Sequence, residues 1–340
     1  METLRLCFHN LLSFYLSIIS TLLRLLLYPL PTINKRFPLF LPFIDAYVSL
    51  LFRFSSLSPC TLDLDEHTTI HFWAPNHRHF NKPNLLLIHG YGGDAKWQFM
   101  YQVRSLAQSF NLYIPDLLFF GKSFTTRTER SEEFQAKCVV EGLKGLGVKK
   151  CSMFAISYGG FVGYRMAEMY PEMVEKVVIL SSGVGCSKEQ KEEQLKKIGR
   201  DPVELLIPAK PEHLHVLVNL SIYKYNPFKW APDYFLQEFI DMISRSHLKE
   251  KQELVHHLLS DHTDCIWPIL TQETLLIWGD KDRVFPLMFG HQLQRHLGPR
   301  AKLEIIKNTG HAANIESPDS VNALIRAFIL QQSKDLNCSI

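Results

Sequence analysis

The feature that most constrains the fold is an apolar run that breaks at a serine and then continues with helical periodicity. Residues 151–156 have the composition of a buried strand, and the apolar positions of residues 161–170 recur as they do in a helix. Ser157 is therefore expected in a sharp turn that lifts its hydroxyl clear of the sheet. Such a turn needs small neighbours because strand and helix approach closely, and Ala155 and Gly159 are small. The pattern predicts a nucleophile elbow.

A serine hydroxyl is a weak nucleophile that needs a base, and the base needs an acid to fix its tautomer. The strand-like residues 274–278 are followed closely by Asp280 and Asp282, and the strand-like residues 303–307 are followed by His311. Side chains just past the carboxyl ends of parallel strands share one edge of the sheet, where active sites are built. Either aspartate follows its strand closely enough to reach the histidine. Asp280 comes directly after a glycine, where aspartates commonly accept hydrogen bonds from turn amides.

A glycine-rich loop supplies a fourth element. Residues 85–88 are typical of a buried strand, and they lead into His89 and then Gly90, Tyr91, Gly92 and Gly93. Such a loop can turn backbone N–H groups toward a developing negative charge. The expected oxyanion hole uses the backbone amides of Tyr91 and Tyr158. His89 is expected to brace the loop rather than to transfer protons.

With these motifs the chain resembles the α/β-hydrolase superfamily over about residues 60–332. The motifs that carry the resemblance lie at residues 89–92, 115–117, 120–123, 155–159, 279–286 and 308–311. The resemblance implies an α/β fold with a mostly parallel, doubly wound sheet. It also favours Asp282 as the acid, since the superfamily uses the second aspartate of Gly-Asp-x-Asp. The predicted catalytic triad is Ser157, Asp282 and His311.

Within the superfamily, the His-Gly loop followed by Trp97, and the elbow at residues 157–160, are most similar to carbon-carbon bond hydrolases and plant esterase-like hydrolases. Epoxide hydrolases and haloalkane dehalogenases differ because their elbow carries an aspartate. The resemblance implies a serine hydrolase that forms an acyl-enzyme with an apolar carboxylic ester, lactone or acylglycerol. Carbon-carbon cleavage of a vinylogous diketone and a ligand-binding receptor on the same fold remain as alternatives. No cofactor or metal is implied.

Strand and helix patterns alternate along the chain, which predicts a parallel sheet. After the sixth expected strand, near residues 177–181, about 90 residues precede the next one, far more than a crossover needs. We expect a helical lid over about residues 186–270, within a hydrolase domain at residues 60–332 and before a tail at residues 333–340. The aromatic residues of the lid indicate an apolar or aromatic substrate. They are Phe228, Trp230, Tyr234, Phe235, Phe239 and Trp267.

The amino terminus is strongly apolar but has one polar helical face, so residues 1–30 are expected to form an amphipathic helix. Arg24 interrupts the apolar run before it reaches the length of a spanning helix. The three alternatives are a helix on a membrane surface, which we favour, a single anchor, and a cap on the hydrolase domain. Residues 31–59 contain several prolines and are predicted to be a linker.

Charge and cysteine content bound the partners and the compartment. The net charge is only +3, and acidic and basic residues are mixed along the chain, which argues against a nucleic-acid partner. The seven cysteines are scattered and form no C-x-x-C pair. This argues for reduced thiols and against a disulfide framework or a zinc site. The expected location is the cytosolic side of a membrane, at the endoplasmic reticulum or another lipid surface, with the soluble cytosol as the alternative.

Overall fold

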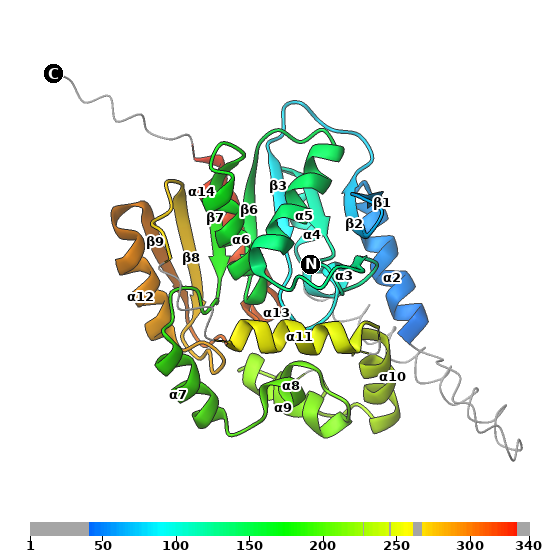
Figure 1. Cartoon of the computed structure of the whole chain (residues 1–340), viewed down its shortest axis with the longest axis vertical. Coiled ribbons are helices and arrows are strands. Elements are labelled where there is room, and N and C mark those ends of the chain that lie inside the picture. The colour runs from blue at the N-terminus through cyan, green and yellow to red at the C-terminus, as the bar shows by residue number, and fades with distance from the viewer. Residues whose placement is uncertain (1–40, 227, 245, 261–266, 332–340) are drawn as a thin grey trace, which may run out of the picture. The chain divides into compact units, whose positions relative to one another are not determined.

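The computed structural model describes residues 41–226, 228–244, 246–260 and 267–331 (Figure 1). Within these residues, a central sheet has the strand order β1-β2-β4-β3-β6-β7-β8-β9, and β5 pairs with the start of β2. The strands are β1 (Leu57–Asp63), β2 (Thr68–Pro75), β3 (Asn84–Ile88), β4 (Asn111–Pro115), β5 (Phe124–Thr125), β6 (Cys151–Ile156), β7 (Val174–Leu180), β8 (Glu273–Gly279) and β9 (Ala301–Ile306).

From β4 to β9 neighbouring strands are parallel, whereas β1 and β2 pair antiparallel and β2 pairs antiparallel with β4. Strands β3 and β6 are buried along their whole length, which explains why their sequences are almost entirely apolar, apart from Asn84 and Ser152, rather than alternating. The predicted fold class, a mostly parallel doubly wound sheet, is confirmed. The two-residue β5 was not expected, and because of it the sixth expected strand is β7.

Helices cover both faces of the sheet. Successive residues of β6 point to opposite faces, so that Met153 and Ala155 belong to one hydrophobic core and Phe154 and Ile156 to the other. The first core is closed by α5 (Glu132–Gly145), α6 (Tyr158–Met169) and α12 (Leu287–Leu297). The second is closed by α2 (Leu41–Phe54), α3 (Ala95–Phe99), α4 (Val103–Leu106) and α14 (Pro318–Leu330).

Five helices lie between β7 and β8 in the described residues, and Figure 1 shows them across the ends of the central strands. They are α7 (Lys188–Ile198), α8 (Pro202–Leu206), α9 (Pro211–Ser221), α10 (Asp233–Ser244) and α11 (Leu248–Leu259). Helices α9, α10 and α11 follow the apolar periodicity of their sequences. Helix α7 has no buried residue and no such periodicity, and a capping box between Ser187 and Gln190 fixes its start. We call these helices and their connections the insertion.

The predicted linker at residues 31–59 differs from the structure over the residues that the structure describes. Residues from Leu41 to Phe54 form α2, and β1 already begins at Leu57. The reason is packing: Val48 and Phe52 are buried, and the ring of Phe52 lies 5.1 Å from that of Trp73 on β2. The expected amino-terminal helix at residues 1–30 and the tail at residues 333–340 lie outside the described residues. Among the helices that are described, none has the length and apolarity to cross a membrane.

Candidate active site

Ser157 lies in the tight turn between β6 and α6, with backbone angles φ 52° and ψ −115°. A positive φ is strained for a residue other than glycine, and such strain is kept where the surroundings enforce it. Here the Ser157 N–H donates to the carbonyl of Leu180 at 2.9 Å, and the hydroxyl of Ser182 donates to the Ser157 carbonyl at 2.8 Å. A Cβ on Gly159 would lie 2.4 Å from the carbonyl oxygen of His89, so this position requires glycine. The turn has the geometry of the predicted elbow.

His311 and Asp282 meet beyond the ends of β9 and β8. The Nδ1 of His311 lies 2.9 Å from Oδ2 of Asp282, and both side chains are buried. The other carboxylate oxygen, Oδ1, accepts hydrogen bonds from the backbone N–H groups of Val284 at 2.8 Å and Phe285 at 2.9 Å. These bonds fix the orientation of the carboxylate, and its Oδ2 accepts a hydrogen bond from the Nδ1–H of His311. This leaves Nε2 of the ring without the proton.

Asp280, the other candidate acid, has a different role. Its Oδ1 accepts a hydrogen bond from the N–H of Thr309 at 3.3 Å, and its Oδ2 lies 3.5 Å from the ammonium of Lys281. Asp280 therefore ties the end of β8 to the loop that carries His311, as expected for an aspartate in a turn. The structure brings Asp282, not Asp280, to the histidine.

The glycine-rich loop after β3 is braced from two directions. Gln98 on α3 accepts a hydrogen bond from the Gly90 N–H at 2.7 Å and donates to the Gly90 carbonyl at 3.0 Å. His89 pairs through Nδ1 with the Gly90 carbonyl at 2.7 Å and accepts at Nε2 from the Leu117 N–H at 2.9 Å. Burial lowers the pKa of His89, which keeps the ring neutral and suited to one donor and one acceptor role. The expected bracing role of His89 is confirmed.

Tyr91 and Tyr158 lie on the two sides of the elbow. Tyr158 is the first residue of α6, and backbone N–H groups in the first turn of a helix have no partner within it. The rings of Tyr91 and Tyr158 contact each other edge to face, with centroids 5.8 Å apart. The hydroxyl of Tyr91 donates to the backbone carbonyl of Lys251 on α11, so that the glycine-rich loop is attached to the insertion.

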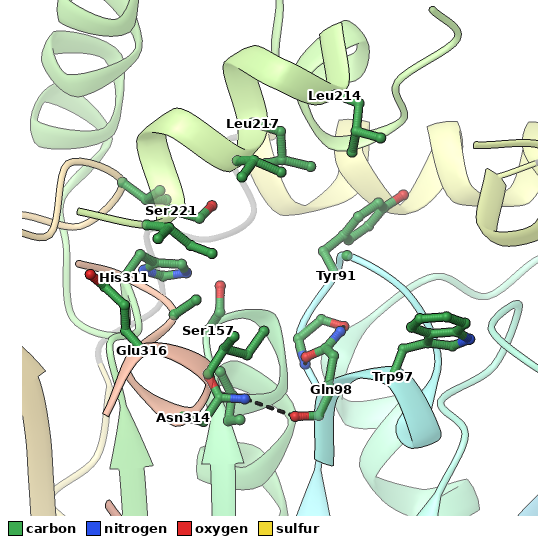
Figure 2. Close-up of a pocket in the computed structure, with 18 of the residues that line it drawn as sticks. Tyr91, Trp97, Gln98, Ser157, Leu214, Leu217, Ser221, His311, Asn314 and Glu316 are labelled. Carbon is green, nitrogen blue, oxygen red and sulfur yellow. Dashed lines mark hydrogen bonds between the residues drawn. The ribbon is translucent and has the colours of Figure 1, made fainter. Parts of the chain in front are cut away.

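Ser157 and His311 line one pocket of about 370 Å³ together with Tyr91 (Figure 2). Helix α9 covers this pocket with Leu214 and Leu217. Most of the lining is apolar or aromatic. Its other members include Trp97, Met100, Tyr101, Ile156, Leu206, Val218, Ile222, Tyr225, Phe228, Phe239, Ile243, Val284 and Ile315.

Of the six aromatic residues expected to roof the pocket, Phe228 and Phe239 line it. Trp267 instead packs on α6, edge to face with Tyr164 at 5.2 Å. Trp230 and Tyr234 are exposed. Composition identified the segment that contributes to the pocket, but it could not say which side chains point inward.

The sequence is similar to known proteins over most of its length. The family described as alpha/beta hydrolase fold matches residues 83–201. A 2-hydroxy-6-oxononadienedioate/2-hydroxy-6-oxononatrienedioate hydrolase of a Pseudomonas species is 28% identical over 261 residues, which cover 72% of this chain and 87% of that protein. The structure of 2-hydroxy-6-oxo-6-phenylhexa-2,4-dienoate hydrolase from Rhodococcus sp. strain RHA1 superposes with a TM-score of 0.69 at 18% identity, covering 80% of this chain and 98% of the other. The chain has the α/β-hydrolase fold, and its similarity in sequence supports a member of the α/β-hydrolase superfamily.

Epoxide hydrolase 4 of Mus musculus is also similar to this α/β-hydrolase, with 23% identity over 301 residues and 79% of each chain covered. The expected dissimilarity to epoxide hydrolases is therefore wrong for the sequence as a whole. The expected contrast at the elbow, where this chain has Ser157, stays a prediction.

Two residues of this α/β-hydrolase that organise the site were not singled out from the sequence. Gln98 holds the glycine-rich loop, as described above, and the Asn314 side chain in turn donates to the Gln98 carbonyl at 2.8 Å (Figure 2). Glu316 accepts from the Gly310 N–H at 2.6 Å and from the N–H groups of Tyr223 and Lys224. The available signal for Gln98 was its place one turn after the helix cap Asp94. Glu316 bonds a segment about 90 residues away, which no local pattern reveals.

Asp94 and Asp116 are two interacting carboxylates whose pKa values are shifted in opposite directions. Burial, followed by the negative charge of Asp116, raises the pKa of Asp94 to about 7. Burial acts in the same direction on Asp116, but the hydrogen bond and charge of His71 at 2.9 Å, together with His89 and the Ala95 N–H, outweigh it and lower the pKa of Asp116. The proton is therefore expected on Asp94, whose side chain also accepts the Trp97 N–H at 3.1 Å and caps α3.

We expect Asp94→Asn to stabilise the protein increasingly as the pH rises from about 4 to about 7. In this window folded Asp94 keeps a proton that the unfolded chain has released, so the free energy of unfolding of the wild type falls with pH. Each unit of pKa difference contributes about 1.4 kcal/mol. Asparagine keeps the helix cap and does not titrate. Urea denaturation of both proteins at pH 4.5 and 7.5 measures this; a difference in unfolding free energy that does not change with pH contradicts it.

Proposed function

We propose that this α/β-hydrolase is a serine hydrolase that cleaves an apolar carboxylic ester, lactone or acylglycerol through an acyl-enzyme. The observation that carries the proposal is the placement of Ser157 and His311 on one apolar pocket, with the His311 ring held by Asp282 at 2.9 Å. A serine, a histidine with a free Nε2 and a fixed carboxylate are the parts that acyl transfer needs.

In this proposal, Nε2 of His311 takes the proton of the Ser157 hydroxyl as the oxygen attacks the carbonyl carbon of the ester. The backbone N–H groups of Tyr91 and Tyr158 stabilise the oxyanion that forms. His311 then gives the proton to the alkoxide that leaves, and the acyl group stays on Ser157. A water molecule, deprotonated by the same Nε2, attacks the acyl-enzyme, and the carboxylic acid is released as Ser157 regains its proton.

The charge of the pocket supports a neutral substrate. The Pseudomonas and Rhodococcus hydrolases compared above are named for substrates that are carboxylates, one of them a dicarboxylate. The described residues that line the present pocket include no lysine or arginine. They do include the carboxylate of Glu316, which three backbone N–H groups hold. A substrate carboxylate buried in this pocket finds no cationic partner there, so its desolvation costs much free energy. This disfavours the carbon-carbon bond hydrolase alternative.

A panel of substrates tests this function. The purified protein is expected to react with a fluorophosphonate probe and to hydrolyse p-nitrophenyl esters, with kcat/KM rising from acetyl to longer acyl chains as more of the pocket is filled. A ring-cleavage diketone carboxylate is expected to turn over at least about 100-fold more slowly, which is the effect of about 2.7 kcal/mol. Faster turnover of the diketone supports carbon-carbon cleavage instead. Binding of these compounds without any turnover identifies a receptor on the hydrolase fold.

We also propose that residues 1–30 associate with a membrane surface on its cytosolic side. The support is the polar helical face within an otherwise apolar segment. Substitutions in this segment are part of the vesicle experiment below.

A further inference from the structure

Helix α2 carries apolar side chains on two opposite sides. Val48 and Phe52 face the core, whereas Phe43, Tyr47, Leu50 and Phe54 are exposed. These four follow one another at steps of four, three and four residues, which places them in one stripe along the helix. Phe43 is 75% exposed and Phe54 is 83% exposed. A stripe of large apolar groups in water is costly, and contiguous apolar surface of this kind usually marks an interaction site.

The insertion adds a second group of exposed aromatic residues. Tyr223, Tyr225, Trp230 and Tyr234 lie in the loop before α10 and at its start, and Trp230 is 88% exposed. Seventeen large apolar or aromatic side chains are exposed in the described part of the chain. Nine of them are the four of α2, the four at residues 223–234, and Tyr101. We call these nine residues the mouth surface: Phe43, Tyr47, Leu50, Phe54, Tyr101, Tyr223, Tyr225, Trp230 and Tyr234.

The mouth surface adjoins the entrance of the pocket. Tyr101 and Tyr225 belong both to the surface and to the pocket lining. Burial, and then the nearby phenols of Tyr225 and Tyr47, raise the pKa of Tyr101, so the three rings from three segments gather at one place.

Trp97 contacts both α2 and α10. Its indole N–H donates to Asp45 of α2 at 3.2 Å, and its ring contacts Phe239 of α10 edge to face at 5.3 Å. These two contacts fix the apolar stripe of α2 beside the insertion.

We propose that the mouth surface docks on a lipid bilayer, so that the pocket opens toward the lipid. Its composition favours a bilayer: six of the nine residues are Tyr or Trp, the residues that sit at the boundary between headgroups and acyl chains. The exposed charged residues within the same two segments are Arg53, Lys224, Lys229 and Asp233, which give a positive balance toward anionic headgroups.

The chain before α2 supports the same occupant. The amphipathic segment at residues 1–30 leads to α2 through residues 31–40, and ten residues span at most about 35 Å when fully extended. A segment bound to the membrane at residues 1–30 therefore keeps α2, and with it the mouth surface, close to the same membrane.

The proposal deepens the proposed function and rests on it in one respect, namely that the pocket binds an ester. Given that, the substrate class is an ester carried in the bilayer, such as an acylglycerol. Its acyl chain moves from lipid into an apolar pocket, and its apolar surface stays out of water along this path.

Vesicle binding of the full-length protein tests the docking surface. The test variant is Phe43→Ser with Phe54→Ser, two exposed side chains outside the pocket. The control is Phe80→Ser with Ile269→Ser. These side chains are 95% and 63% exposed and precede β3 and β8, so they lie toward the amino ends of these strands, away from the carboxyl ends that carry the site. On vesicles of phosphatidylcholine with phosphatidylglycerol, we expect about tenfold weaker binding for the test variant and unchanged binding for the control. Turnover of a soluble ester is expected to be unchanged in both.

Two further measurements separate the outcomes. Brominated lipids are expected to quench tryptophan fluorescence in the wild type, and Trp230→Phe is expected to remove most of that quenching. Ile18→Asp with Leu22→Asp reports the contribution of residues 1–30. The proposal is overturned if the test variant binds vesicles as well as the control does, because residues 1–30 alone then account for docking. It is also overturned if the test variant differs from the wild type only in its oligomeric state in size-exclusion chromatography, because the surface is then a protein interface. A wild type that binds vesicles but hydrolyses no ester refutes the proposed function and leaves the docking surface standing.

Discussion

Ser157→Ala is expected to lower kcat for a soluble ester on the order of 10⁴-fold or more, while the melting temperature stays close to that of the wild type. The hydroxyl is the proposed nucleophile, and replacing it with hydrogen opens little volume. The hydrogen bonds that hold the turn use the backbone of residue 157, with the Leu180 carbonyl and the Ser182 hydroxyl as partners, so they survive the change.

A matched control is Ser181→Ala. Ser181 is buried and, like Ser157, it follows a strand with a positive φ, but it does not line the pocket. Its turnover is expected to stay within a few-fold of the wild type. Near wild-type activity of purified Ser157→Ala, measured with an active-site titration to exclude contamination, refutes the serine hydrolase proposal.

Asp282→Asn is expected to lower kcat by up to ~10⁴-fold with little change in folding. The asparagine oxygen can keep the hydrogen bonds from Val284 and Phe285, which turns the side-chain amide toward Nδ1 of His311. An N–H donor at that place selects the tautomer with its proton on Nε2, and a ring in this form cannot accept the proton of Ser157. The stabilisation of the imidazolium is lost as well.

Asp280→Asn is the comparison. It keeps an acceptor for the Thr309 N–H and is expected to change kcat only a few-fold, with a loss of stability of about 1 kcal/mol. Measuring kcat and the melting temperature of both variants separates the two roles. If Asp280→Asn is the inactive and well-folded one, the assignment of the acid is wrong.

The sequence predicted those parts of the site that depend on local patterns. The elbow needs a strand, a serine and small neighbours within a few residues, and Asp282 and His311 each follow a strand directly, so their meeting follows from a parallel sheet. The contacts of Gln98 and Glu316 were not predictable in this way. Gln98 acts through the peptide group of Gly90, and Glu316 acts through amides of a distant segment, and neither interaction requires a recognisable residue type at the other end.

The same distinction holds for the fold. Helices α9, α10 and α11 have the apolar periodicity of helices packed on one side, which the sequence displays. The linker prediction for residues 31–59 rested on prolines, but Pro31 and Pro38 precede α2 and Pro42 lies in its first turn, where proline is tolerated. The place of α2 became clear only from what it packs against, the ring of Trp73 and the second core.

The carboxylate of Glu316 has a mechanical consequence. It joins the loop of His311 to the residues that follow α9, and the Ala312 N–H adds a bond of 2.9 Å to the Ser221 carbonyl. Tyr91 and Lys251 fasten α11 at a second point, and the Lys251 ammonium donates to the Ile243 carbonyl at 2.7 Å. With two pivots fixed, a swing of the whole insertion breaks bonds to the very loops that carry the proposed base and oxyanion hole. The span between these two points of attachment contributes Phe228 and Phe239 to the pocket lining, and a change of shape within that span need not break the bonds of Glu316 and Tyr91.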